Sequence, residues 1–340
     1  MRSRLHGIGG KSHYAAILGS SPSRGARSPA LWNAVFSALE VDCVFGAYDV
    51  VEEELGSVVG SLKADPGFIG GAVAAPYKSS IVPHLDEVEP EAEKIGAVNA
   101  MYRRGKSLVG ANTDGQGAMA SLVNLVGDAD WIPGKRVLVL GVGGAGKAVA
   151  TYLAKGCGSK GAVWLWNRTE SKAEGLVERL KSYGCMVRSL RQAEIPAVLS
   201  ETDLLVNCTT VGSTDQAPAG AARLVNELAT PLAVMDLPAG SDGEAEVTAS
   251  VADIIGRNVA ASLEMLAKLP SRAIVFDIIY RPPVTMLLKL GGSLGLRTLN
   301  GLGMNLEQAV IACRDALVHS GLWDSQRPVD TIRQIMRGVP

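Results

Sequence analysis

Short apolar runs alternate along the chain with longer segments in which apolar residues recur every three or four positions. In the first third of the chain, the short runs predict strands at residues 14–19, 43–50, 68–74, 97–102 and 107–111. The longer segments predict helices at residues 28–39, 52–64 and 115–126. The first of these helices has Ser28 as its expected cap, followed by Pro29 in its first turn.

The same alternation resumes at Lys135, after a boundary loop at residues 128–134. It predicts strands at residues 136–140, 162–167, 185–190, 203–208, 233–236 and 273–277, and helices at residues 170–183, 251–268 and 304–322. Repeated strand–helix units of this length favour parallel pairing in a doubly wound α/β sheet. The long segment 213–272 is expected to elaborate one edge of that sheet, and a lid over a ligand is an open alternative.

The composition indicates a folded enzyme. At 340 residues the chain is long enough for two domains, and its net charge of −1 favours neither a nucleic-acid partner nor a disordered acidic tail. The longest apolar stretches are strand-length, and the first residues lack the apolar core of a signal peptide. The five cysteines are scattered, as buried thiols in a reducing compartment are, and the four histidines share no metal-ligand spacing.

We therefore expect a cytoplasmic protein with a small-molecule partner, no nucleic-acid partner, no membrane partner and no metal. A homodimer is an open alternative for its assembly.

A glycine-rich turn ends the apolar run that begins at Arg136. It consists of Gly141, Gly143, Gly144, Ala145 and Gly146, and a helical pattern follows it. The glycines permit a tight turn and a close approach of the backbone to a ligand, and the free N–H groups of the helix start favour an anion. A strand, such a turn and a helix in this order are typical of a dinucleotide diphosphate site.

The end of the next predicted strand indicates which dinucleotide binds. An NAD site usually carries Asp or Glu there for the ribose 2′-hydroxyl, whereas this chain has Asn167, Arg168 and Thr169, with Lys172 close behind. A carboxylate would repel a 2′-phosphate, and Arg168 would pair with one. The expected cofactor is therefore NADP.

Further motifs accompany the glycine turn in a fixed order. They are Ser28-Pro29, Pro76-Tyr77-Lys78, Asn99, Asn112-Thr113-Asp114, Asn167-Arg168-Thr169, Asn207-Cys208-Thr209, Tyr280 with Thr285, and Gly303 to Gln308. Together they resemble the shikimate/quinate dehydrogenase family from about residue 17 to residue 312. The resemblance implies an α/β enzyme of two domains. An N-terminal substrate domain would comprise residues 1–127, with 303–340 folding back onto it, and a Rossmann-type NADP domain would comprise residues 128–302.

Lys78 and Asp114 match the catalytic pair of that family. Both follow predicted strands, so their side chains could meet at one edge of a sheet. Hydride attack on a ketone builds negative charge on oxygen, and a Lys–Asp pair can supply or remove the balancing proton. A surface salt bridge worth about 0–1 kcal/mol is the plain alternative for such a pair taken alone.

The resemblance assigns further residues to the substrate and the cofactor. Those matched to the substrate are Ser28, Asn99, Tyr280 and Gln308, and those matched to the cofactor beyond the turn and residues 167–172 are Thr209 and Gly303. Three of these have plain alternatives: a helix cap for Ser28, a turn for Asn99 and core packing for Tyr280.

The chain also departs from the family's pattern. Alanines at 26, 72 and 74 replace the usual Ser, Asn and Thr, while Trp32 and Asn305 replace a usual His and Leu. Each hydrogen bond lost to an alanine is worth about 0.5–1.5 kcal/mol. Arg24 and Arg27 flank the missing serine and could bind a carboxylate instead.

The expected activity is interconversion of shikimate and 3-dehydroshikimate or a close cyclic polyhydroxy acid. A quinate or aminoshikimate dehydrogenase is an alternative of the same class. An alternative of another class is a dehydrogenase-like sensor that binds nucleotide or metabolite and catalyses nothing.

Overall fold

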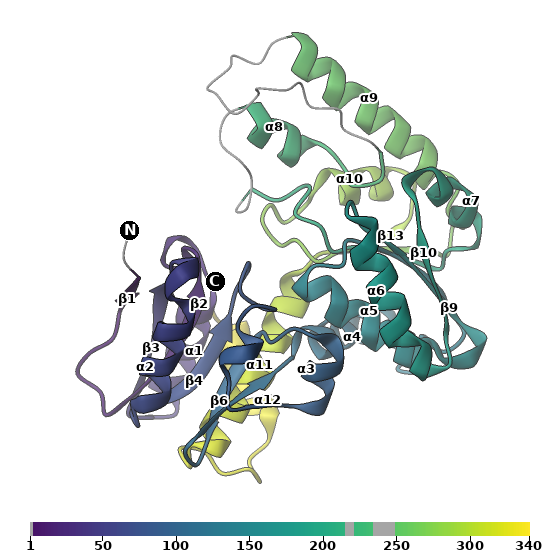
Figure 1. The fold of residues 1–340 in the computed structure, drawn as a ribbon. Helices are drawn as coiled ribbons and strands as arrows, with labels where there is room; N and C mark the ends of the chain where they lie inside the picture. The colour runs from purple at the N-terminus through teal and green to yellow at the C-terminus, as the bar shows by residue number, and fades with distance from the viewer. Residues whose placement is uncertain (1–2, 215–220, 234–248) are drawn as a thin grey trace. The chain divides into compact units, whose positions relative to one another are not determined.

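The chain forms two compact units in the computed structural model (Figure 1), which describes residues 3–214, 221–233 and 249–340. Unit 1 comprises Met1–Gly117 and Asn305–Pro340, and unit 2 comprises Ala118–Met304. Each unit is built on its own sheet and has its own apolar core.

Unit 1 contains a seven-stranded sheet in the order β1-β3-β2-β4-β6-β7-β5. Its strands are β1 (Arg4–His6), β2 (His13–Gly19), β3 (Cys43–Asp49), β4 (Phe68–Val73), β5 (Glu87–Val88), β6 (Ala100–Arg104) and β7 (Ser107–Ala111). The central strands β2, β3 and β4 are parallel, and β6 runs antiparallel to both of its neighbours. The ends of β2, β4 and β7 and the start of β6 therefore meet at one edge of the sheet.

Helices cover both faces of this sheet. They are α1 (Ser28–Ala38), α2 (Leu55–Ala64), α3 (Pro90–Ile95), α12 (Val329–Arg337) and the part of α11 (Leu302–His319) that begins at Asn305. One face packs Trp32 and Phe45 against α11 and α12, which are yellow in Figure 1. The other face packs Phe68 against α2. The segment after residue 304 is thus part of the core of unit 1.

Unit 2 contains a six-stranded parallel sheet in the order β10-β9-β8-β11-β12-β13. Its strands are β8 (Arg136–Leu140), β9 (Ala162–Trp166), β10 (Met186–Leu190), β11 (Leu204–Asn207), β12 (Ile274–Asp277) and β13 (Arg297–Leu299). The chain order reverses at β8, and ligands of such sheets bind beside the carboxyl ends of the strands at this reversal. This is the doubly wound sheet that the alternating pattern predicts.

The helices of unit 2 lie on both sides of its sheet. They are α4 (Asp114–Val126), which begins in unit 1, α5 (Gly144–Cys157), α6 (Glu170–Leu180), α7 (Ile195–Val198), α8 (Ala221–Leu228), α9 (Ala249–Leu266) and α10 (Met286–Ser293). The segment 213–272 contributes α8 and α9, whose apolar residues pack together around Val225 and Ile254.

Most predicted elements exist within a few residues of their expected bounds, and three predictions need correction. The strand predicted from residue 97 begins only at Ala100, because residues 97–99 turn toward the site described below. The helix predicted to reach residue 183 ends at Leu180 and continues as a 3₁₀ turn. Ser28 is the first residue of α1, and no side chain caps that helix. Except for Ala233, the strand predicted at 233–236 lies outside the described residues.

Candidate active site

Lys78 and Asp114 meet at the edge of the unit 1 sheet. Lys78 follows β4, and its carbonyl accepts a 2.7 Å hydrogen bond from the N–H of Val98. Asp114 begins α4 just after β7. Lys78 Nζ lies 2.6 Å from Asp114 Oδ2, and the two side chains are only 19% and 6% exposed. The pair is therefore shielded from water, as an exposed surface salt bridge would not be.

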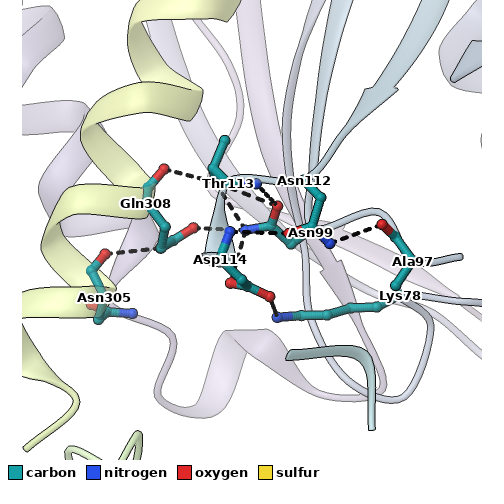
Figure 2. Close-up of polar contacts among 8 residues, drawn as sticks. All are labelled: Lys78, Ala97, Asn99, Asn112, Thr113, Asp114, Asn305 and Gln308. Carbon is teal, nitrogen blue, oxygen red and sulfur yellow. Dashed lines mark hydrogen bonds and ion pairs between the residues drawn. The ribbon is translucent and has the colours of Figure 1, made fainter. Parts of the chain in front are cut away.

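Asn99 connects this pair to α11 (Figure 2). Its Nδ2 lies 3.0 Å from Asp114 Oδ1 and 3.1 Å from Gln308 Oε1, and its Oδ1 accepts from the N–H of Thr113 at 2.7 Å. Asn99 is buried, and these partners lie far from it in sequence. Its side chain bridges two strand ends and a helix, which goes beyond stabilising a local turn.

Two neighbours of Asp114, which the sequence analysis lists in a motif without assigning them a role, hold this cluster. Asn112 Nδ2 donates to the carbonyl of Ala97 at 2.8 Å, and its Oδ1 accepts from the N–H of Asp114 at 3.1 Å. Thr113 Oγ1 donates to the carbonyl of Gln308 at 3.0 Å. The available signal was a run of three polar residues at the end of an apolar strand.

The three alanine departures make part of this edge apolar. Ala26 and Ala74 pack against the apolar cluster that contains Trp32 and Phe45, and Ala72 is a member of that cluster. Trp32 is fully buried, with its ring centroid 4.7 Å from that of Phe45, so it is a core residue. Ser28 is 6% exposed at the start of α1.

In unit 2 the glycine turn brings the backbone of three strand ends close together. Gly141 has φ of +92°, and a Cβ there would lie 2.8 Å from Thr209 Cγ2. A Cβ at Gly146 would lie 2.1 Å from the carbonyl oxygen of Gly141. Side chains at these two positions would push the start of α5 away from the turn. By contrast, a Cβ at Gly143 would meet nothing within 4 Å. This open, backbone-lined helix start fits a diphosphate.

Asn167, Arg168 and Thr169 follow β9 beside this turn. Asn167 Oδ1 accepts a 3.0 Å hydrogen bond from the N–H of Val142, and its Nδ2 donates to the carbonyl of Thr169 at 2.9 Å. Arg168 is exposed and forms no ion pair within the part of the chain that the structure describes. The loop is thus fixed to the glycine turn, and its guanidinium is available for an anion.

Two more cations gather near Lys172, and sequence reasoning missed them. Burial lowers the pKa of the Lys147 ammonium, and repulsion from Arg179 and Lys172 lowers it further. The ammonium of Lys147 is therefore within reach of the charges of both Arg179 and Lys172. An anion such as a phosphate would relieve this repulsion, so this electrostatic environment fits the phosphates of NADP.

A buried polar network joins the ends of β11 and β12. Asp277 Oδ2 accepts from Thr285 Oγ1 at 2.7 Å, and its Oδ1 accepts from Asn207 Nδ2 at 3.0 Å and from the N–H of Ile279 at 3.1 Å. Asn207 Oδ1 in turn accepts from Thr209 Oγ1 at 2.7 Å. This network shapes the loops that follow both strands.

Tyr280 and Gly303 belong to unit 2. Tyr280 lies three residues after β12, half-buried and outside the apolar core clusters, so core packing does not account for it. A Cβ at Gly303 would lie 2.6 Å from Ser121 Oγ. Gly303 therefore permits α11 to approach α4 closely.

Within the described residues no three His, Cys, Asp or Glu side chains are placed to hold a metal ion. No helix of residues 3–214, 221–233 and 249–340 is long and apolar enough to span a membrane. All five cysteines are free thiols.

Comparisons with known proteins show which family the chain is similar to. Residues 18–101 match the family model "Shikimate dehydrogenase substrate binding domain", and residues 128–254 match "Shikimate / quinate 5-dehydrogenase". A shikimate dehydrogenase (NADP(+)) of Symbiobacterium thermophilum is 31% identical over 95% of this chain and 93% of its own length. One of Geobacter metallireducens is 33% identical over 90% of this chain and 91% of its own length.

The fold is similar to solved structures as well. Shikimate 5-dehydrogenase from Thermus thermophilus, solved in complex with NADP(H) and shikimate, superposes with a TM-score of 0.68 at 27% identity. The match covers 96% of this chain and 100% of the Thermus thermophilus chain. The likeness thus extends over both units.

Proposed function

Because this chain belongs to the shikimate dehydrogenase family, we propose that it interconverts shikimate and 3-dehydroshikimate, with Lys78 and Asp114 moving the proton. The chain is an oxidoreductase. Its expected cofactor is NADP, which Arg168 indicates and which the names of its relatives include. The observation that carries the proposal is the shielded 2.6 Å contact between Lys78 and Asp114, with Asn99 and Gln308 beside it.

The chemistry of the Lys78–Asp114 pair suits an alcohol–ketone conversion. When bound, NADP supplies or accepts the hydride. In the reducing direction, the Lys78 ammonium donates a proton to the oxygen on which negative charge develops. In the oxidising direction, the amine accepts the hydroxyl proton. Asp114, 2.6 Å from the Lys78 ammonium, holds Lys78 in place.

Asn99, Gln308 and Ser28 are the proposed substrate-binding residues of unit 1. Asn99 and Gln308 present amide donors and acceptors next to Asp114, a combination that suits vicinal hydroxyl groups. In unit 2, Tyr280 is the proposed substrate contact. The glycine turn, residues 167–169, Lys172, Thr209 and Gly303 are proposed to hold NADP.

A substrate panel tests the activity. The purified chain is assayed for NADPH formation or consumption with shikimate, quinate and aminoshikimate and with their dehydro forms. Turnover is expected, and fastest with shikimate and 3-dehydroshikimate. Measurable NADPH binding without turnover of any compound would contradict the enzyme and favour the sensor.

Lys78→Met tests the proton transfer. We expect kcat to fall about 10²–10⁴-fold, because positioned acid–base groups contribute this much, while the Kd for NADPH stays unchanged. Lys63→Met is the matched control, since Lys63 also pairs with an aspartate, Asp86, at 2.5 Å. A Lys78→Met variant that melts like the parent and keeps its kcat would refute the assignment.

A further inference from the structure

A hydrogen bond in unit 1 joins Asn305, a departure from the family pattern, to Arg27, the neighbour of another departure. Arg27, beside the alanine at position 26, donates from Nη1 to Asn305 Oδ1 at 3.4 Å, across a separation of 278 residues. Asn305 occupies a position where the family pattern has Leu. Arg27, next to the position where the family has a serine, therefore contacts a polar side chain, Asn305, where the family has an apolar one.

Arg27 lies at one end of a continuous hydrogen-bonded row that has Lys78 at its other end (Figure 2 shows the row from Asn305 to Lys78). The carbonyl of Asn305 accepts from Gln308 Nε2 at 2.9 Å. Gln308 then contacts Asn99, and Asn99 contacts Asp114. A ring that has its reacting carbon at Lys78 and its hydroxyls on Asn99 and Gln308 would extend along this row toward Arg27.

The charge on Arg27 is not neutralised by a side chain. Within the described residues Arg27 forms no ion pair with Asp or Glu, whereas Arg333 of the same unit pairs with Glu307 at 2.9 Å. The side-chain partner of Arg27 is the neutral Asn305 Oδ1, and Nη2 also lies 3.4 Å from a main-chain oxygen of Pro340, the last residue of the printed chain. A half-buried guanidinium that no Asp or Glu side chain neutralises favours a bound carboxylate.

We propose that Arg27, positioned by Asn305, binds the substrate carboxylate in place of the serine hydroxyl absent at Ala26. The proposal rests on the proposed function, since it concerns the same substrate. A guanidinium forms two parallel charge-assisted hydrogen bonds with a carboxylate. These bonds would replace the hydrogen bonds that alanines at positions 26 and 74 cannot form.

The first test measures KM and kcat for shikimate in Arg27→Ala. We expect KM to rise about tenfold to hundredfold, the range for losing hydrogen bonds to a charged group. We expect kcat to change only a few-fold, because the carboxylate is held equally in ground state and transition state. Arg24→Ala is the matched control. Arg24 is exposed on the same loop, so its removal should leave KM unchanged.

The second test separates carboxylate binding from a structural role. With the methyl ester of shikimate, which has no carboxylate charge, Arg27→Ala should behave like the parent. Adding Ala26→Ser to Arg27→Ala should restore part of the affinity for shikimate. Asn305→Leu should raise KM less than Arg27→Ala, and combining the two should add little, because both act on one contact.

Deleting residues 338–340 removes the other partner of Arg27 and should leave KM for shikimate unchanged. If Arg27→Ala leaves KM for shikimate unchanged in an active enzyme, the proposal is overturned. An equal loss for acid and ester, matched by the 338–340 deletion, would overturn it too, since Arg27 would then only tie down that segment. A parent enzyme inactive on the whole panel would instead refute the proposed function.

Discussion

Asp277 should make the stability of unit 2 depend on pH. The carboxyl group is fully buried at the end of β12, and burial raises its pKa from 3.8 to about 6, against the opposing effect of three donated hydrogen bonds. In the unfolded chain the same group is solvated and titrates near its ordinary pKa. The folded state therefore binds this proton more tightly than the unfolded state does.

The size and sign of the effect follow from that difference. A rise from 3.8 to about 6 corresponds to about 3 kcal/mol at 1.36 kcal/mol per pKa unit. This contribution is fully present below pH 4 or so and is lost as pH rises through about 6. About 2 kcal/mol of it should disappear between roughly pH 4.5 and 7.5.

The comparison that isolates Asp277 is the parent against Asp277→Asn. Asn keeps an oxygen for Asn207 and Ile279 and has no proton to gain, so the free energy of unfolding of the variant should lack this pH-dependent contribution. Urea unfolding is followed at several pH values by pulsed hydrogen exchange of peptides covering β11 and β12, so that unit 2 is observed separately. The stability of the variant relative to the parent should rise by about 2 kcal/mol from pH 4.5 to 7.5.

A difference that stays constant with pH would refute the reasoning, because the Asp277 carboxyl would then titrate alike in both states. Asp253→Asn, at an exposed position of α9, controls for the loss of a carboxyl group. It should give a flat difference. A slope of opposite sign would mean that the three hydrogen bonds outweigh the cost of burial.

Two predictions concern the cofactor side of unit 2. Arg168→Ala should weaken NADPH binding about tenfold to hundredfold in a titration and leave NADH binding nearly unchanged. Lys181→Ala, just beyond α6, is the control. An equal loss of affinity for both dinucleotides would contradict the 2′-phosphate assignment. Gly146→Ala should lower the free energy of unfolding by about 1–3 kcal/mol, because its Cβ would overlap the carbonyl oxygen of Gly141 at 2.1 Å. Gly143→Ala should keep that stability and lose NADPH affinity, so equal stability losses would contradict the close-approach argument.

Helices and strands could be predicted from the sequence where local patterns of apolar residues determine them. Apolar runs such as 136–140 and helical spacing such as that of α5 are local properties, and they predicted the doubly wound sheet with every strand but β13. Short elements were not predicted. The two-residue β5 and the four-residue α7 bury too few apolar side chains to leave a periodic pattern. Partners elsewhere in the fold stabilise them.

Part of the candidate site could be predicted for the same reason. Lys78, Asn99 and Asp114 each lie at a strand end, and parallel or reversing strands bring such ends to one edge. The roles of Asn207 and Asp277 were less visible, since both lie near the end of a predicted buried strand. Only the register of β11 against β12 places them side by side, in a pairing 70 residues apart in sequence.

Arg27 marks the point at which sequence reasoning stops and the fold adds new information. Along the chain, Arg24 and Arg27 are equivalent candidates for a carboxylate, because both flank Ala26 on one loop. In the fold they differ: Arg24 is exposed at the end of a 3₁₀ turn, whereas Arg27 is half-buried against Asn305. The alanine at 26 and the asparagine at 305 are separate departures in the sequence, and the hydrogen bond between Arg27 and Asn305 joins the second to the neighbour of the first. Loss of polar groups at 26, 72 and 74 therefore need not mean loss of substrate binding, since a charge-assisted pair is stronger than the neutral hydrogen bonds it would replace.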